Sequence, residues 1–171
     1  GIARQHEQET IGSLISDLGS KNKVTRGKAH DHLLAMGESA VIPLVRALSD
    51  PSARVRWEAG KLLDKINVSW TTHADTETIG ALVNDLSSDD GLVRVRARRA
   101  LVSIGGKAVN ALANALESKN EGQRWEAVKA LGQIGDPAAT GILIRALEDE
   151  VFDVRWLATE GLIAIGRPVL V

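Results

Sequence analysis

The chain has 171 residues, with 21 basic and 22 acidic side chains and a net charge of −1. A general nucleic-acid binder usually carries a basic surplus, so this balance argues against that class except at local clusters. The absence of cysteine excludes disulfides and thiolate metal sites. No apolar run reaches the roughly 20 residues that a membrane-spanning helix needs. The polar segment 1–10 lacks a signal-peptide core, and we expect a cytoplasmic protein.

Five segments of the chain share one pattern, which is aligned on an arginine. Each aligned arginine has a leucine eight residues before it, an alanine three residues after it and a leucine seven residues after it. The aligned arginines, spaced by 30, 38, 30 and 31 residues, are Arg26, Arg56, Arg94, Arg124 and Arg155. A period of this size indicates one supersecondary unit stacked on copies of itself.

Each unit is predicted to hold two helices. Apolar residues recur at helical spacing between Ile11 and Leu18 in the first unit, and between Val154 and Ile165 in the last. The predicted units, all within a single domain covering residues 1–171, are 8–37, 39–67, 76–105, 107–135 and 137–166. Only 3% of the residues are aromatic, so we expect aliphatic side chains to fill the core.

Helix ends are marked by turn residues. Asp50-Pro51 and Asp136-Pro137 each predict an N-cap followed by proline at the first helical position. The residue eleven places after each aligned arginine predicts a C-terminal cap in the left-handed conformation. These caps are Gly37, Asn67, Gly105, Gly135 and Gly166. Ser39 is a plausible cap for the helix that contains Pro43, which places this proline in the first turn.

Residues 68–75 interrupt the period and are predicted to form an insertion loop. We expect Trp70 to cover the apolar seam between the second and third units. The alternative is that Trp70 and His73 contact a ligand, since loops often carry function. The segment from 167 onwards reads as the start of a truncated next repeat.

The sequence resembles the short HEAT-like repeats of prokaryotes, which are named for the phycobilisome lyases that contain them. The resemblance is clearest from Val128 to Pro137, which contains Leu-Gly-Gln-Ile-Gly, and from Leu147 to Arg155. It implies an all-α fold, an α-solenoid (superhelix) of about five two-helix repeats of about 30 residues. Such solenoids offer long concave binding surfaces but host many unrelated functions.

Three of the four tryptophans directly follow an aligned arginine: Trp57, Trp125 and Trp156. On a helical wheel this position points away from the core positions, onto the inner curve of the solenoid. Exposed tryptophan is enriched at binding hot spots. The alternative is that each ring packs over the next second helix. The predicted partner-binding residues are Trp57, Trp125, Trp156, Arg96, Arg99 and Lys129.

The cluster Arg94–Arg99 contains four arginines and could bind phosphate together with Arg54 and Arg56. The alternative is pairing between repeats. The residues two places after the aligned arginines alternate in sign through the first four units: Lys28, Glu58, Arg96 and Glu126. We also expect the aligned arginines to bridge to acidic residues of adjacent loops.

The histidines do not predict a metal site. In a HEAT-like metalloenzyme, deoxyhypusine hydroxylase, His-Glu dipeptides near the start of second helices hold two irons. The comparable dipeptides here are Trp57-Glu58 and Trp125-Glu126, which lack the imidazole. His30 and His32 lie two residues apart and do not share a helix face. We expect His32 to face the core.

Three functions follow from these patterns. The first is a non-catalytic scaffold that binds a protein or peptide along the concave face, as a monomer or weak oligomer, with no cofactor and no membrane contact. The second, which the resemblance implies, is a bilin lyase-like enzyme or lyase subunit, in which the tryptophans stack a flat chromophore. The third is nucleic-acid binding through Arg94–Arg99. No catalytic residue, cofactor site or metal site is assigned.

Overall fold

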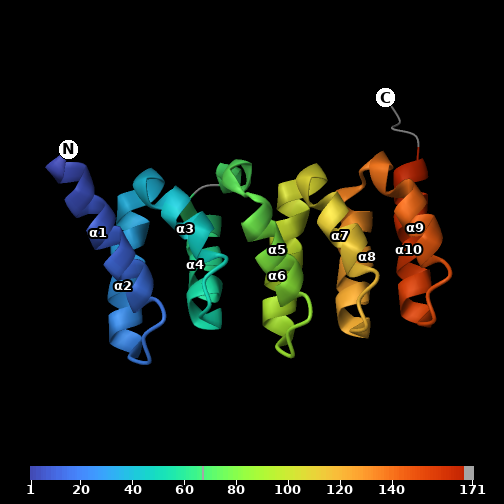
Figure 1. Cartoon of the computed structure of the whole chain (residues 1–171), viewed down its shortest axis with the longest axis horizontal. Coiled ribbons are helices and arrows are strands. Elements are labelled where there is room, and N and C mark those ends of the chain that lie inside the picture. Colours follow the sequence, from blue (N-terminus) through green and yellow to red (C-terminus); the bar gives the residue numbers. More distant parts are fainter. Residues whose placement is uncertain (67, 168–171) are drawn as a thin grey trace. The chain divides into compact units, whose positions relative to one another are not determined.

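The computed structural model describes residues 1–66 and 68–167, and all regular structure in them is helical (Figure 1). This confirms the predicted all-α class. Two predictions lie outside the described residues: the cap at Asn67, and the next repeat over residues 168–171.

In the described part of the chain, the α-helices form five consecutive pairs along the sequence. The first helices of the pairs are α1 (Ile2–Asp17), α3 (Val41–Ala47), α5 (Thr76–Asp85), α7 (Val109–Ala115) and α9 (Thr140–Ala146). The second helices are α2 (Lys23–Met36), α4 (Ala53–Ile66), α6 (Gly91–Ile104), α8 (Glu121–Ile134) and α10 (Phe152–Gly166). Short 3-10 helices precede four of the first helices: η1 (Gly37–Ala40), η2 (Val68–His73), η3 (Gly105–Ala108) and η4 (Pro137–Ala139). We number the pairs as repeats one to five.

The chain divides into two compact units, residues 1–78 and 79–171. In the first unit, α1 packs on α2 and α3, and α4 packs on α2 and α3. In the second unit, α8 lies between α6 and α10, while α7 and α9 pack on α8 and α10 respectively. Each unit therefore has the two-layered arrangement of a helical repeat, with second helices side by side.

The repeated alanines and leucines form the core. All five alanines that follow the aligned arginines are at most 2% exposed, which lets neighbouring second helices approach closely. The leucines seven residues after the arginines are fully buried in the first four repeats: Leu33, Leu63, Leu101 and Leu131. Burial of one such leucine stabilises the fold by about 2 kcal/mol. In the last repeat the equivalent leucine, Leu162, is half-buried.

Three of the predicted glycine caps are confirmed. Gly37, Gly105 and Gly135 have positive φ angles of 57°, 74° and 68°, which glycine adopts without steric cost. The prediction at Gly166 was wrong, because α10 continues through this residue and its C-cap is Arg167.

Of the two predicted Asp-Pro caps, one is confirmed. Asp136 accepts a hydrogen bond from the Ala138 amide at 2.9 Å at the start of η4. The cap at Asp50 was wrong, because the Asp50 carboxylate instead accepts from the Ser52 amide at 2.8 Å. Ser52 then caps α4 by accepting from Val55 at 3.3 Å, so the helix begins two residues later than predicted.

Three further differences concern the first repeats. Helix α1 begins at Ile2 rather than near residue 8, because exposed good helix formers extend it. His32 is exposed, so its expected core position was wrong. The buried face of α2 is set by Ala29 and Leu33, four residues apart. Pro43 lies in the first turn of α3, as predicted.

The predicted insertion loop contains the 3-10 helix η2, which packs on α3 and α4. Trp70 is 4% exposed, so its expected burial is confirmed, whereas His73 is exposed. The next helix, α5, is capped by Asp75, whose carboxylate accepts from the Thr78 amide at 2.8 Å. This hydrogen bond lowers the pKa of Asp75. In the part of the chain that the structure describes, no helix is both long and apolar enough to cross a bilayer.

Candidate partner-binding site

The five aligned arginines make the same contact in every repeat. Each donates from Nη1 to the backbone carbonyl six residues earlier, in the loop that joins the two helices of its own repeat. The distances are 2.7 Å (Arg26–Ser20), 2.8 Å (Arg56–Asp50), 2.6 Å (Arg94–Ser88), 3.0 Å (Arg124–Ser118) and 2.7 Å (Arg155–Asp149). Carbonyls beyond a helix end lack an intrahelical partner, and the charged guanidinium supplies one. The contact that the repeats share is therefore a loop carbonyl rather than the expected acid.

The expected bridge to an adjacent loop is present at Arg124. Its Nε lies 3.0 Å from Oδ2 of Asp149, and its Nη2 lies 3.4 Å from Oε1 of Glu150. Arg124 is 7% exposed. The guanidinium therefore fixes its own loop with one nitrogen and the loop of the next repeat with the other two.

Glu126 lies at the centre of a second ionic cluster. It is 5% exposed, and its Oε2 lies 3.2 Å from Nε of Arg98, which is also buried. Its Oε1 lies 3.9 Å from Nε of Arg94. Burial raises the pKa of the Glu126 carboxyl, and the positive charges of Arg98, Arg94 and Lys129 oppose this shift.

Residues at the predicted alternating positions also pair with residues at other positions. Glu126 pairs with Arg98 and Arg94. Glu58 pairs with Lys61 of its own helix at 3.0 Å. The reason is geometric: a residue four places after the aligned arginine, such as Arg98, faces the next second helix.

The predicted arginine patch is also altered. Arg98 is buried and Arg94 is half-buried, both directed at Glu126, whereas Arg99 is exposed. Only part of the positive charge counted in the sequence is therefore available to a phosphate. Among residues 1–66 and 68–167, no group of three His, Asp or Glu side chains could hold a metal ion.

The tryptophans differ in exposure. Trp156 is 57% exposed on α10, whereas Trp57 and Trp125 are half-buried. Lys129 places its Nζ 4.7 Å from the centre of the Trp125 ring. Trp57 belongs to the first compact unit, and the other predicted site residues, including half-buried Arg96, belong to the second. The structure thus brings Trp125 and Lys129 together on α8, with Trp156 on the neighbouring helix.

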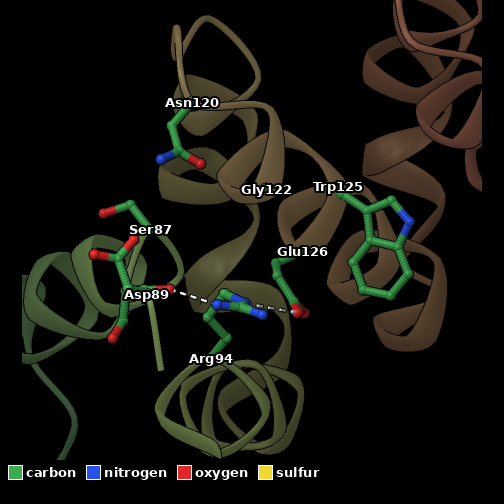
Figure 2. A pocket seen from close by; sticks show the side chains of 8 residues that line it. Ser87, Asp89, Arg94, Asn120, Gly122, Trp125 and Glu126 are labelled. Carbon is green, nitrogen blue, oxygen red and sulfur yellow. Dashed lines mark hydrogen bonds and ion pairs between the residues drawn. The ribbon is translucent and has the colours of Figure 1, made fainter. Parts of the chain in front are cut away.

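A pocket of about 390 Å³ lies beside this face, between the α5–α6 loop and the start of α8. We call it the Arg94 pocket; its lining includes Ser88, Asp89, Arg94, Asn120, Trp125 and Glu126. Figure 2 shows Arg94 and Glu126 pointing toward one another, with Asn120 at the start of α8.

Sequence patterns predicted Trp125 as a binding residue, but they did not place Asp89, Asn120 and Glu126 beside it in one pocket. Each has a fixed offset from an aligned arginine, so a comparison of the loops between repeats could have found them. The missing information was which neighbouring loops face each other.

Comparisons with known proteins agree with this geometry. A family model for HEAT repeats matches residues 79–163. The chain is 29% identical over 170 residues to an uncharacterized phycocyanin operon protein Z of Pseudanabaena tenuis, covering 95% of this chain and 83% of that protein. It is 38% identical over 85 residues to a phycobilisome maturation protein of Synechococcus elongatus, covering 49% of this chain and 41% of that protein. A designed armadillo repeat protein in complex with the peptide (KR)4 superposes with a TM-score of 0.53 over 96% of this chain and 85% of that chain, at 19% identity.

The helix pairs and the likeness to a solved repeat structure define an α-solenoid protein. Within this class, residues 79–163 match the model of the HEAT repeats, and the chain is similar to a phycocyanin operon protein and to a phycobilisome maturation protein. Such a fold suits a scaffold that binds peptides or proteins.

Proposed function

We propose that the chain is a non-catalytic scaffold that binds a protein partner through the face formed by α6, α8 and α10. The observation that carries this proposal is the exposure of Trp156, at 57% of its surface. An indole in water costs solubility and gives no packing energy, whereas at an interface its large rigid surface contributes strongly to affinity.

The surroundings of Trp156 support the same proposal. Trp125 occupies the equivalent position on α8, and Lys129 lies over its ring. Arg99 on α6 holds the position equivalent to Lys129 and is exposed. Tryptophan and arginine are the residues most enriched at hot spots of protein interfaces. We therefore assign Trp125, Lys129, Trp156 and Arg99 to the binding face, with Arg96 at its edge and Trp57 as the equivalent residue of the first unit.

The names of the two relatives suggest the class of partner. One belongs to a phycocyanin operon and the other is a phycobilisome maturation protein. We propose that the partner is a phycobilisome component or a protein that acts in its maturation.

Affinity capture from a lysate of a phycobilisome-containing cyanobacterium tests this proposal. The baits are the native chain, Trp156→Ala, and Ile144→Ala as matched control. Ile144 is 52% exposed, close to the value for Trp156, but lies on α9 of the same repeat. Equal helical circular dichroism of the three baits is checked first.

We expect a phycobilisome-related protein to be retained by the native chain and by Ile144→Ala, and lost with Trp156→Ala. Equal retention by all three baits would move the site away from this face. Loss with both variants would show a general effect of removing exposed apolar surface.

A second candidate is the handling of a bilin, as in a lyase or lyase subunit. It is favoured by the likeness to a phycocyanin operon protein over 95% of the chain. The exposed Trp156 ring could stack on a flat tetrapyrrole. Mixing the chain with phycocyanobilin tests this candidate. A shifted absorbance band that Trp156→Ala abolishes would support it, and an unchanged spectrum would remove it.

A further inference from the structure

The contacts of Arg124 and Arg94 differ although the two arginines hold equivalent positions. Arg124 uses Nη1 for its own loop and directs Nε and Nη2 to the Asp149 carboxylate, at 3.0 and 3.4 Å. Arg94 uses Nη1 in the same way, at 2.6 Å from the Ser88 carbonyl. The carboxylate oxygen that pairs with its Nε, Oε1 of Glu126, is 3.9 Å away, beyond hydrogen-bond distance.

The difference follows from the loop of the next repeat. Asp149 and Glu150 stand six and five residues before the aligned Arg155, and they reach back to Arg124. At the same two positions before Arg124 stand Ser118 and Lys119. The chain therefore provides two acids beside Arg124 and none from the corresponding loop positions beside Arg94, where the Arg94 pocket lies instead.

We propose that the Arg94 pocket binds the carboxylate of an Asp or Glu side chain in an acidic segment of the protein partner. This inference rests on the proposed scaffold function and adds the chemistry of one contact. The partner's carboxylate takes the place that Asp149 occupies beside Arg124, with Nε of Arg94 as donor.

Three features of the pocket suit an acidic segment. The contact to Ser88 holds the guanidinium of Arg94 in place, so little side-chain entropy is lost on binding. Asn120 caps the start of α8, and this helix end carries partial positive charge. The Trp125 ring provides an apolar wall for neighbouring residues of the segment.

Two carboxylates of the pocket, those of Glu126 and Asp89, would repel a bound anion, and we expect the two repulsions to differ in strength. Glu126 is compensated by Arg98 at 3.2 Å. Asp89 is exposed at the rim, so removing its charge should improve binding of an acidic segment about twofold.

A peptide from the chain itself provides the probe. Fluorescein-labelled peptide 147–154, Leu-Glu-Asp-Glu-Val-Phe-Asp-Val, contains the two acids that contact Arg124. Its control carries Asn and Gln in place of Asp149 and Glu150. Fluorescence anisotropy with the full chain should show binding of the acidic peptide at low salt, weakening as salt increases, and at least tenfold weaker binding of the control.

The most informative variant supplies the carboxylates beside Arg94 from the chain itself, so that they compete with the peptide. Ser118→Asp with Lys119→Glu places the acids of the fifth repeat in the loop beside Arg94. It should lower the affinity for the peptide at least tenfold and raise the melting temperature. The matched control, Ser20→Asp with Lys21→Glu, makes the same change in the loop of repeat one. Its affinity for the peptide should stay within about twofold of the native value at a salt concentration that screens the added negative charge, which is the same in both variants.

Several results would overturn the inference. The first is that the acidic peptide does not bind, or binds no more tightly than its control. The second is that the two double variants lose equal affinity for the peptide. The third is that Asp89→Asn does not bind the peptide more tightly than the native chain. Competition by sodium succinate at the peptide's own concentration would show a site for free carboxylates rather than for a segment. Partner capture that depends on Trp156 but not on the Ser118/Lys119 change would overturn only this inference and keep the proposed function.

Discussion

At the scale of single residues, an aligned arginine stabilises the fold through a bond to a loop carbonyl and, at Arg124, also through an ion pair. We therefore expect its replacement to lower the free energy of unfolding by different amounts in different repeats. Arg124 is buried and pairs with Asp149, whose side chain is 12% exposed. Arg124→Met leaves that carboxylate without its cation, and we expect a loss of about 2–4 kcal/mol in the free energy of unfolding.

Arg26→Met is the control for this prediction. Arg26 is half-buried and donates to the Ser20 carbonyl, so its replacement should cost about 1 kcal/mol. Urea unfolding followed by circular dichroism measures both. Equal losses would show that the bridge to Asp149 adds nothing beyond the loop contact.

The buried Glu126 predicts a dependence of stability on pH. Burial raises its pKa, so its contribution to stability is present below the ordinary carboxyl value and lost as pH rises through the raised value. Replacing Glu126 with Gln, which is neutral at every pH, removes this loss of stability at high pH. Glu126→Gln should therefore unfold at higher urea than the native chain at pH 7, and at nearly equal urea near pH 4.

The opposite order at pH 7 would contradict this prediction. A variant less stable than the native chain would mean that the attraction of Arg98 and Arg94 outweighs burial, so that the pKa of Glu126 is lowered. The double variant with Arg98→Met separates the two contributions, because it removes both buried charges together.

Residue periodicity predicted the core well and the polar contacts poorly. Burial of the aligned alanines follows from helical spacing alone. The contact from Arg94 to the Ser88 carbonyl depends on the shape of a loop, which spacing does not specify. His32 was misplaced because neighbouring Leu33 already defines the buried face.

At the scale of elements, α8 and α10 approach each other closely at Gly132 and Gly161. A methyl group added to Gly161 would lie 3.1 Å from the Cα of Gly132 and 3.1 Å from Cδ1 of Leu143. Gly161→Val must push the helices apart, and we expect it to destabilise the fold by about 1–3 kcal/mol despite the better helix propensity of valine.

Gly141→Ala in α9 is the matched substitution, because nothing lies within 4 Å of its added methyl group. It should stabilise by about 0.5–1 kcal/mol through helix propensity. Thermal unfolding of both variants checks the pair. A stable Gly161→Val variant would mean that α8 and α10 are not held at this distance.

The sequence predicted the end of a helix correctly where a single residue type, such as glycine, determines it. The positive φ of Gly105 and Gly135 follows from glycine alone. The start of α4 depended on a competition between Asp50 and Ser52 for amide groups, which sequence spacing cannot resolve. The 3-10 turns before α3, α7 and α9 were missed because their apolar spacing resembles that of the following helix.

At the scale of the molecule, repeat proteins draw their stability from each repeat and its contacts with neighbours. The sequence predicted the period of the repeats. It could not predict the Arg94 pocket, since that feature arises from two acids being present in one loop and replaced in another. The proposed site accordingly combines a feature of three of the repeats, a tryptophan directly after the aligned arginine, with loop residues that differ from one repeat to the next.

The affinity of the captured partner for three forms of the chain tests the central claim most directly. Isothermal titration with the native chain, Trp156→Ala and Ile144→Ala should give at least a tenfold weaker Kd for Trp156→Ala, as for a hot-spot residue. Ile144→Ala should stay within about twofold of the native Kd, a difference below that expected for hot-spot residues. Equal Kd values for the native chain and Trp156→Ala would contradict binding through the face of α6, α8 and α10.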